Sequence, residues 1–229
     1  YSQTLAWLFQ RLPMYQRVGA PAMRLGLDQM NRLSAALGNP HRSLKCIHIA
    51  GTNGKGSTAH MLASVLQTAG YTVGLYTSPH LQDFRERIKI NGQPIDKETV
   101  VDFVNKHLET LEAGNYSFFE ATVGMAFSSF AHAQVDVAII EVGLGGRLDA
   151  TNIITPILSV ITRISKDHQQ FLGHTIEAIA GEKAGIIKQK VPVVLGQNEK
   201  TVKKVILEKA KSTSSTVFFA NQTESYTTD

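Results

Sequence analysis

The residues best suited to chemistry lie in a glycine-rich stretch that holds one lysine. Residues 47–58 read IHIAGTNGKGST, which departs twice from the phosphate-loop pattern G-x-x-x-x-G-K-[ST]. Ile49 stands where the first glycine is expected, and Gly56 separates Lys55 from the hydroxyl residues that follow. Glycines allow backbone N–H groups to point towards an anion, and the lysine adds a mobile point charge for phosphate oxygens. The alternative is a helix N-terminus with an incidental lysine.

Two further polar residues stand at the ends of apolar runs. Glu141 ends the run VDVAIIE, where a carboxylate beside a phosphate loop could hold Mg²⁺ directly or through water. A rim carboxylate paired with Arg147 or Lys55 is an equally good interpretation from the residues alone. Ser78 precedes Pro79 in TSPH, and the proline restricts it to extended backbone. The residues alone favour a capping or turn serine at this position.

A histidine and a lysine in the later part of the chain are also candidates. His168 directly follows Asp167, and a lone histidine beside an aspartate is more often structural than a metal ligand. Lys183 stands in GEKAGI on a predicted helix, where the residues alone favour a solvated lysine next to Glu182. Neither residue would be assigned to a site without further information.

The elements that must position these residues alternate between strands and helices. Short apolar runs predict strands over residues 44–50, 72–77, 135–142, 157–161, 192–195 and 216–219. Apolar residues at helical spacing predict helices over residues 57–69, 98–111, 119–131, 175–187 and 202–210. This alternation predicts an α/β fold with a doubly wound, mostly parallel sheet, flanking helices and ligands at the carboxyl ends of the strands. The first forty residues are expected to form helices beside the sheet, and the polar tail 221–229 to be a linker or a frayed end.

Composition excludes several classes of protein. The 229 residues are 43% hydrophobic and 18% charged, which suits one large domain with a full core. The net charge of +4 comes without a block of Lys or Arg, which favours anionic small ligands over nucleic acid. Cys46 is the single cysteine, and no apolar run approaches the roughly 20 residues that a membrane helix needs. We therefore expect a cytoplasmic monomer with no nucleic-acid or membrane partner.

Five stretches, in order along the chain, resemble one family. GTNGKGST resembles the phosphate loop of the Mur-ligase superfamily of ATP-dependent amide-bond-forming enzymes, and its extra glycine, Gly56, is similar to the folylpolyglutamate synthase/dihydrofolate synthase branch. The other stretches are LGLDQM (25–30), LYTSPHLQDFRERIKINGQPI (75–95), IIEVGLGGRLDATN (139–152) and DHQQFLGHTIEAIAGEKAGIIK (167–188). The resemblance implies a fold with a P-loop-type Mur-ligase central domain.

The resemblance also implies a set of site residues. The nucleotide is expected on residues of the glycine-rich loop: Thr52, Asn53, Gly54, Lys55, Gly56 and Ser57. The implied Mg²⁺ ligands are Ser78, Glu141 and His168, the last acting through water or at a second metal position, and a monovalent cation is a further candidate cofactor. Lys55 and Lys183 are the catalytic candidates, and the family carbamylates a lysine at the position of Lys183. The implied pterin or folate contacts are Leu25, Gly26, Leu27, Phe119, Glu120, Leu148, Asp149 and Ala150.

The implied reaction joins L-glutamate to a folate or to dihydropteroate. ATP phosphorylates a substrate carboxylate to an acyl phosphate, and the α-amine of glutamate then displaces phosphate. A cell-wall Mur-type ligase and a P-loop nucleotide-binding module without ligase chemistry are the alternatives; Gly56 and TSPHLQDFRERI argue against the first. The second is disfavoured by the segment 167–188, for which a simple nucleotide switch has no use.

The family also has a second, C-terminal domain that contributes to nucleotide and glutamate binding. Residues after about 197 supply one more helix and a strand, which finish the first domain or begin a linker. We therefore expect residues 1–229 to be the N-terminal ATP-binding domain, with the C-terminal glutamate-ligase domain absent and the isolated fragment inactive or nearly so.

Overall fold

A single mixed sheet forms the centre of the computed structural model, which describes residues 1–13, 26–220, 225 and 226. Within these residues the strand order is β4-β3-β2-β5-β1-β6-β7-β8-β9. The six central strands run parallel: β2 (Val73–Tyr76), β5 (Val137–Glu141), β1 (Cys46–Ala50), β6 (Leu158–Ile161), β7 (Val193–Leu195) and β8 (Val217–Phe219). The predicted α/β class with a mostly parallel sheet is confirmed, and each predicted strand is present, shortened at one or both ends.

Both edges of the sheet are antiparallel, which the sequence reasoning missed. At one edge, β3 (Ile88–Ile90) pairs with β2, and β4 (Gln93–Pro94) pairs with β3. Asn91 and Gly92 join them with φ angles of 49° and 76°, so this Asn-Gly turn is a hairpin signal that the sequence already carried. At the other edge, β9 (Ser225–Tyr226) pairs with β8, within the tail that was expected to be a linker or a frayed end.

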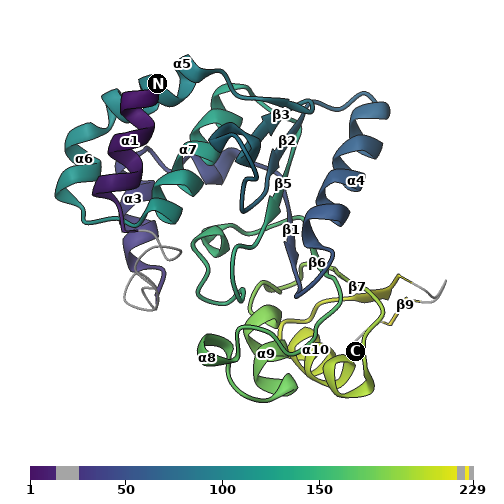
Figure 1. Ribbon diagram of the computed structural model, residues 1–229. Helices are drawn as coiled ribbons and strands as arrows, with labels where there is room; N and C mark the ends of the chain where they lie inside the picture. The colour runs from purple at the N-terminus through teal and green to yellow at the C-terminus, as the bar shows by residue number, and fades with distance from the viewer. Residues whose placement is uncertain (14–25, 221–224, 227–229) are drawn as a thin grey trace.

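Helices cover the two faces of the sheet unequally (Figure 1). One face packs against helices from the first 132 residues: α1 (Ser2–Arg11), α3 (Asp28–Ala36), α5 (Lys97–Lys106), α6 (Leu108–Ala113) and α7 (Phe118–His132). The other face packs against α4 (Lys55–Thr68), through a separate core that includes Ile47, Ile49 and Ile139. The expectation of helices packed beside the sheet in the first forty residues is met by α1 and α3.

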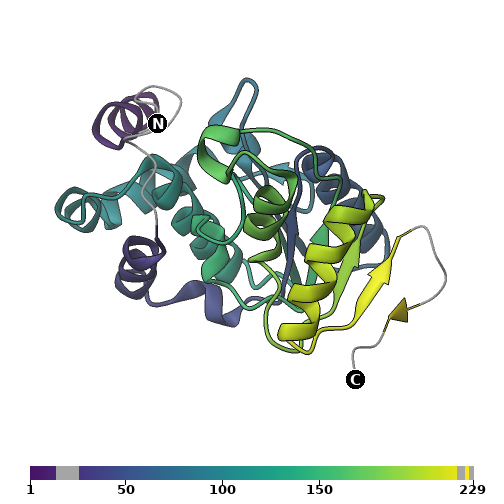
Figure 2. The same cartoon turned by 90° about the horizontal axis from the view of Figure 1, so that it is seen from below.

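A third core surrounds the later strands. The helices there are α9 (Ile176–Ala184) and α10 (Lys200–Ser212), and the short α8 (Gln169–Leu172) precedes them. Figure 2 shows α10 and the late strands at the opposite side of the molecule from α1. None of the helices in the described part of the chain is long and apolar enough to cross a membrane.

Two predicted helices have different ends in the structure. The helix predicted over residues 98–111 is interrupted at His107, which separates α5 from α6. The helix predicted over residues 175–187 ends at Ala184, so the prediction was wrong for Gly185, Ile186 and Ile187. Both isoleucines are buried in the same core as α9, so their apolar side chains fitted the pattern of a longer helix although the backbone is not helical there.

Candidate active site

The glycine-rich loop connects β1 to α4, as its strand and helix context predicted, and we call residues 51–57 the phosphate loop. Gly51 and Gly54 have φ angles of 155° and 85°, which favour glycine. The helix begins at Lys55, and its first hydrogen bond runs from the Thr58 amide to the Gly54 oxygen at 2.9 Å. The preceding amides at this helix end have no partner within the helix, so they and the positive end of the helix dipole suit an anion.

The first part of the phosphate loop is held by the chain itself. The amides of Thr52 and Asn53 donate to the Arg163 oxygen, at 2.8 and 3.3 Å. The Thr52 hydroxyl donates to the Ser165 oxygen and accepts from the Ser165 amide, both at 3.1 Å. The amides of Thr52 and Asn53 are therefore already occupied, and the backbone amides left for an anion are those after Asn53.

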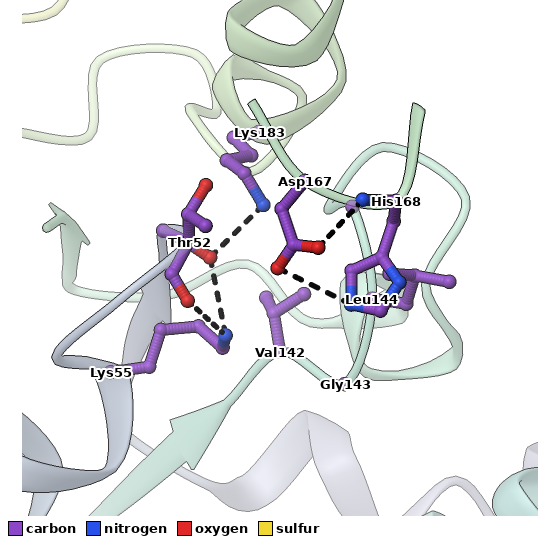
Figure 3. Close-up of a pocket in the computed structure, with 10 residues that line it drawn as sticks. Thr52, Lys55, Val142, Gly143, Leu144, Asp167, His168 and Lys183 are labelled. Carbon is purple, nitrogen blue, oxygen red and sulfur yellow. Dashed lines mark hydrogen bonds and ion pairs between the residues drawn. The ribbon is translucent and has the colours of Figure 1, made fainter. Parts of the chain in front are cut away.

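Two lysines converge on one carbonyl oxygen in this loop (Figure 3). Lys183 Nζ donates to the Gly51 oxygen at 3.0 Å, and Lys55 Nζ donates to the same oxygen at 3.2 Å and to the Thr52 oxygen at 3.3 Å. Lys183 is only 4% exposed, so the interpretation of a solvated lysine beside Glu182 is wrong. Burial, together with the charge of Lys55, lowers the pKa of Lys183 to about 8.

A pocket lies beside these lysines (Figure 3). Its walls come from the phosphate loop, the loop after β5, the segment before α8, and α9. The lining residues are Gly51, Thr52, Lys55, Val142, Gly143, Leu144, Gly145, Asp167, His168 and Lys183. Asp167 is the acid that the sequence reasoning left out of the site, although it precedes His168 in one of the quoted stretches.

The three predicted metal ligands are brought together only in part. Glu141 ends β5, is 5% exposed, and accepts a 3.2 Å hydrogen bond at Oε2 from the Ser78 amide. His168 lies instead in the pocket with the lysines, half exposed, with Nε2 3.5 Å from Asp167 Oδ2. No group of three or more His, Cys, Asp and Glu side chains with metal-site geometry occurs among the residues described here. The metal set stays a prediction.

Glu141 is nevertheless an unusual carboxylate. Burial raises its pKa, while Lys55 and the Ser78 amide partly offset that effect. The described part of the chain holds no cation within 4.0 Å of it, and Arg147 pairs with Glu182 instead, at 2.8 Å. A Cβ built on Gly56 would lie 3.6 Å from Glu141 Oε2, so the carboxylate faces the start of α4. A pairing of Glu141 with Arg147, one of the open alternatives, is therefore not present.

The predicted folate contacts lie on two elements around the loop after β5. Phe119 and Glu120 are in the first turn of α7, where Glu120 Oε2 accepts from the amide and hydroxyl of Ser117 at 2.7 and 2.8 Å. That carboxylate is occupied as a helix cap. A Cβ built on Gly143 would come within 2.5 Å of Phe119 Cζ, so the aromatic ring contacts the pocket loop.

The remaining predicted folate contacts differ in burial and in position. Asp149 and Ala150 are buried, and Leu148 is partly exposed. Gly26 and Leu27 immediately precede α3. Leu25 lies outside the described residues.

Arg87 is a further buried charge that sequence reasoning did not single out. It is 4% exposed, its Nε donates to His80 Nδ1 at 2.7 Å, and its guanidinium lies 5.4 Å from the centre of the Phe118 ring. The described residues include no carboxylate within 4.0 Å of it. Only its place in RERI, within the family-like stretch 75–95, could have drawn attention to it.

Comparison with known proteins finds one family. Residues 49–229 match the family model for the Mur ligase middle domain. The chain is 44% identical over 218 residues to a dihydrofolate synthase/folylpolyglutamate synthase of Bacillus subtilis, covering 92% of this chain and 49% of that protein. The chain spans about half the length of the curated relatives it matches.

Solved structures give the same result. An FPGS–AMPPCP–folate complex is 42% identical with a TM-score of 0.87, over 96% of this chain and 53% of that one. The Escherichia coli FolC complex with DHPP and ADP is 34% identical with a TM-score of 0.82, over 95% of this chain and 50% of that one.

Proposed function

Because this chain belongs to the Mur ligase family, in its folylpolyglutamate and dihydrofolate synthase branch, we propose that the complete protein is an ATP-dependent ligase that adds L-glutamate to folates and to dihydropteroate. The observation that carries the proposal is the convergence of Lys55 and the buried Lys183 on Gly51 at the head of the phosphate loop. A nucleotide switch would need the first lysine and has no use for the second.

The phosphate loop would bind the β- and γ-phosphates of ATP. The amides of Lys55, Gly56 and Ser57 stand at the open end of α4, and the Lys55 ammonium would leave its two carbonyl partners for phosphate oxygens. The terminal phosphoryl group would then pass to the substrate carboxylate, which becomes an acyl phosphate as ADP leaves. The α-amine of glutamate attacks the acyl carbon, so that an amide forms and phosphate departs. Positioning and charge neutralisation carry most of such a reaction.

The residues around Glu141 fit a divalent metal. A buried carboxylate with one hydrogen bond from a backbone amide, and no cation within 4.0 Å in the described part of the chain, has oxygen lone pairs left for a hard ion. Glu141 and the Ser78 hydroxyl would hold Mg²⁺, with His168 joining through water. When bound, Mg²⁺ neutralises charge on the phosphate oxygens.

Lys183 would act as a carbamylated lysine. Its pKa, lowered to about 8, makes a minor neutral fraction of the amine available near neutral pH, and only that form can attack CO₂. The Nζ lone pair forms the N–C bond and one proton leaves, which turns a cation into an anion beside Lys55. The new carboxylate would pair with Lys55 or help to organise the metal.

Folate or dihydropteroate would lie along the loop after β5 and the start of α7. The proposed contacts are Gly26, Leu27, Phe119, Leu148, Asp149 and Ala150, with Leu25 retained from the family resemblance alone. Glu120 would act through its helix cap, because its carboxylate already holds Ser117. This cap would fix the position of the Phe119 ring against Gly143 in the loop after β5.

The proposal is tested by ATP turnover with the complete protein. We expect ADP release that requires L-glutamate together with dihydropteroate or tetrahydrofolate, each assayed separately. Lys183→Ala should abolish it, and bicarbonate should stimulate the unaltered protein but not this variant. Turnover that depends on a UDP-sugar peptide, or that needs no amino acid, would overturn the proposal.

A further inference from the structure

A buried chain of hydrogen bonds connects β1 to the loop after β5, through residues with no role in the steps above except Asp149. His48 lies in β1, three residues before Gly51, and its Nε2 is 2.9 Å from Thr151 Oγ1. The Thr151 hydroxyl and amide both donate to Asp149 Oδ1, the amide at 3.0 Å. Asp149 Oδ2 accepts from the Leu144 amide at 2.9 Å. His48 and Thr151 have no exposed surface, and Asp149 is 6% exposed.

The direction of each bond follows from the chemistry of the donors. Asp149 accepts backbone amides at both oxygens, from Thr151 at Oδ1 and from Leu144 at Oδ2, and the Thr151 hydroxyl donates its single proton to Oδ1. Thr151 Oγ1 must then accept from His48, which is the neutral tautomer protonated at Nε2. Consistent with this, Nδ1 of His48 has no hydrogen-bond partner among the described residues. Burial keeps the imidazole neutral by lowering its pKa to about 3.

The chain of bonds ends on the pocket wall that faces the phosphate loop. Gly143, Leu144 and Gly145 form that wall, and Asp149 is the side chain that holds the Leu144 amide. The same loop contacts the Phe119 ring through Gly143. The phosphate loop on the facing wall is held by different bonds, to Arg163 and Ser165. A defect at Thr151 should therefore displace one wall and leave the other in place.

We propose that Thr151, held by His48, is a positioning residue: it orients the Asp149 carboxylate and thereby sets the Gly143–Gly145 wall against which a pterin-containing acid binds. The identity of the ligand rests on the proposed function. The positioning of the wall rests on the hydrogen bonds alone, and it can be tested without any ligand.

The first test is hydrogen exchange measured by mass spectrometry on the 229-residue protein. Thr151→Val keeps the shape of the side chain and removes the hydroxyl, so the amides in segment 143–148 should exchange faster. Thr151→Ser restores the hydroxyl and should restore slow exchange. Thr213→Val is the matched control, because Thr213 is also buried and hydrogen-bonded but lies at the end of α10. Unaltered exchange in segment 143–148 of Thr151→Val would overturn the inference.

The second test is calorimetric titration with dihydropteroate and with ADP. Thr151→Val should weaken dihydropteroate binding about tenfold, the effect of losing one hydrogen bond to a charged group, and leave ADP binding unchanged. Equal losses for both ligands, or no recovery in Thr151→Ser, would assign Thr151 a general structural role and overturn the positioning. If the unaltered protein bound ADP but no pterin acid, the proposed function would be wrong, and the exchange experiment would still decide the positioning of the wall.

Discussion

Lys183 donates a 3.0 Å hydrogen bond to the Gly51 carbonyl, although the two residues stand 132 positions apart in the chain. The bond joins α9 to the start of the phosphate loop. It places a nearly fully buried amine within reach of the oxygen that Lys55 also uses.

Lys183 should make stability depend on pH in the alkaline range. Its pKa falls from 10.5 in the unfolded chain to about 8 in the folded protein, so the unfolded state binds more protons between these values. Stability therefore rises with pH from about 8 to 10.5, and below pH 8 the buried charge costs about 3 kcal/mol. Lys183→Met should be more stable than the unaltered protein at pH 7, with an advantage that shrinks towards pH 10. Urea unfolding in CO₂-free buffer at several pH values measures this, with the exposed Lys204→Met as control; a constant difference would contradict it.

Glu141→Gln should abolish the effect of Mg²⁺ on ADP binding without lowering the stability of the protein. Burial raises the pKa of Glu141, so folding favours its protonated form and the stability that it contributes declines as pH rises through that pKa. The neutral glutamine should therefore leave the protein at least as stable at pH 7, while Mg²⁺ no longer strengthens ADP binding. Thermal unfolding and titration of ADP with and without Mg²⁺ test both parts. Glu182→Gln, which removes the partly exposed partner of Arg147, should keep the Mg²⁺ effect. Retention of that effect in Glu141→Gln would remove Glu141 from the metal set.

Lys55→Met should weaken nucleotide binding without unfolding the protein. The side chain is partly exposed, and within the described residues its ammonium makes only two hydrogen bonds, both to carbonyl oxygens of its own loop. Losing a charged donor to phosphate should raise the Kd for ADP by about ten- to a hundredfold. Titration calorimetry measures this, with the exposed Lys106→Met as control. Unchanged affinity would mean that Lys55 stays on its carbonyl partners when nucleotide binds.

Gly51→Ala should be among the most damaging single changes in the loop. Gly51 has a φ of 155°, and a Cβ there would overlap the Thr162 hydroxyl, which itself donates to the Ala50 and Asn53 oxygens. We expect a loss of about 2–4 kcal/mol in the free energy of unfolding, from steric overlap and strained backbone. Gly181→Ala is the matched control: nothing lies within 4 Å of a Cβ at that exposed helix position, so the change should stabilise by about 0.5–1 kcal/mol. Denaturant unfolding distinguishes the two, and equal effects would contradict the loop geometry.

Local patterns in the sequence were sufficient for the central part of the fold. Apolar runs located the six parallel strands, and helical spacing located α4, α7 and α10, because each buried face repeats with the period of its own element. The same reasoning failed where an apolar residue is buried without being helical, as at Ile186 and Ile187. It also missed the β3–β4 hairpin, although Asn91 and Gly92 carried the signal for that turn.

In the candidate site, too, features set by local sequence could be predicted and features set by packing could not. The phosphate loop was predictable, because its glycines, lysine and flanking strand and helix are contiguous in the chain. The environment of Lys183 was not, because a helical lysine next to Glu182 reads as solvated until α9 is packed against Gly51. The pocket position of His168 was equally invisible, since it depends on packing in three dimensions. The occupied carboxylate of Glu120 was readable, because Ser117 and Glu120 form a local S-x-x-E capping box.

The sequence by itself therefore determined the α/β class and the family, and it predicted which residues carry the chemistry, since these depend on residue types and short-range spacing. The tertiary structure alone decided which groups meet. Packing α9 onto the strand ends buried Lys183 and lowered its pKa, and the His48–Thr151–Asp149 contacts joined β1 to the pocket loop. Burial and charge proximity set protonation and position, and both arise between segments that lie a hundred residues or more apart.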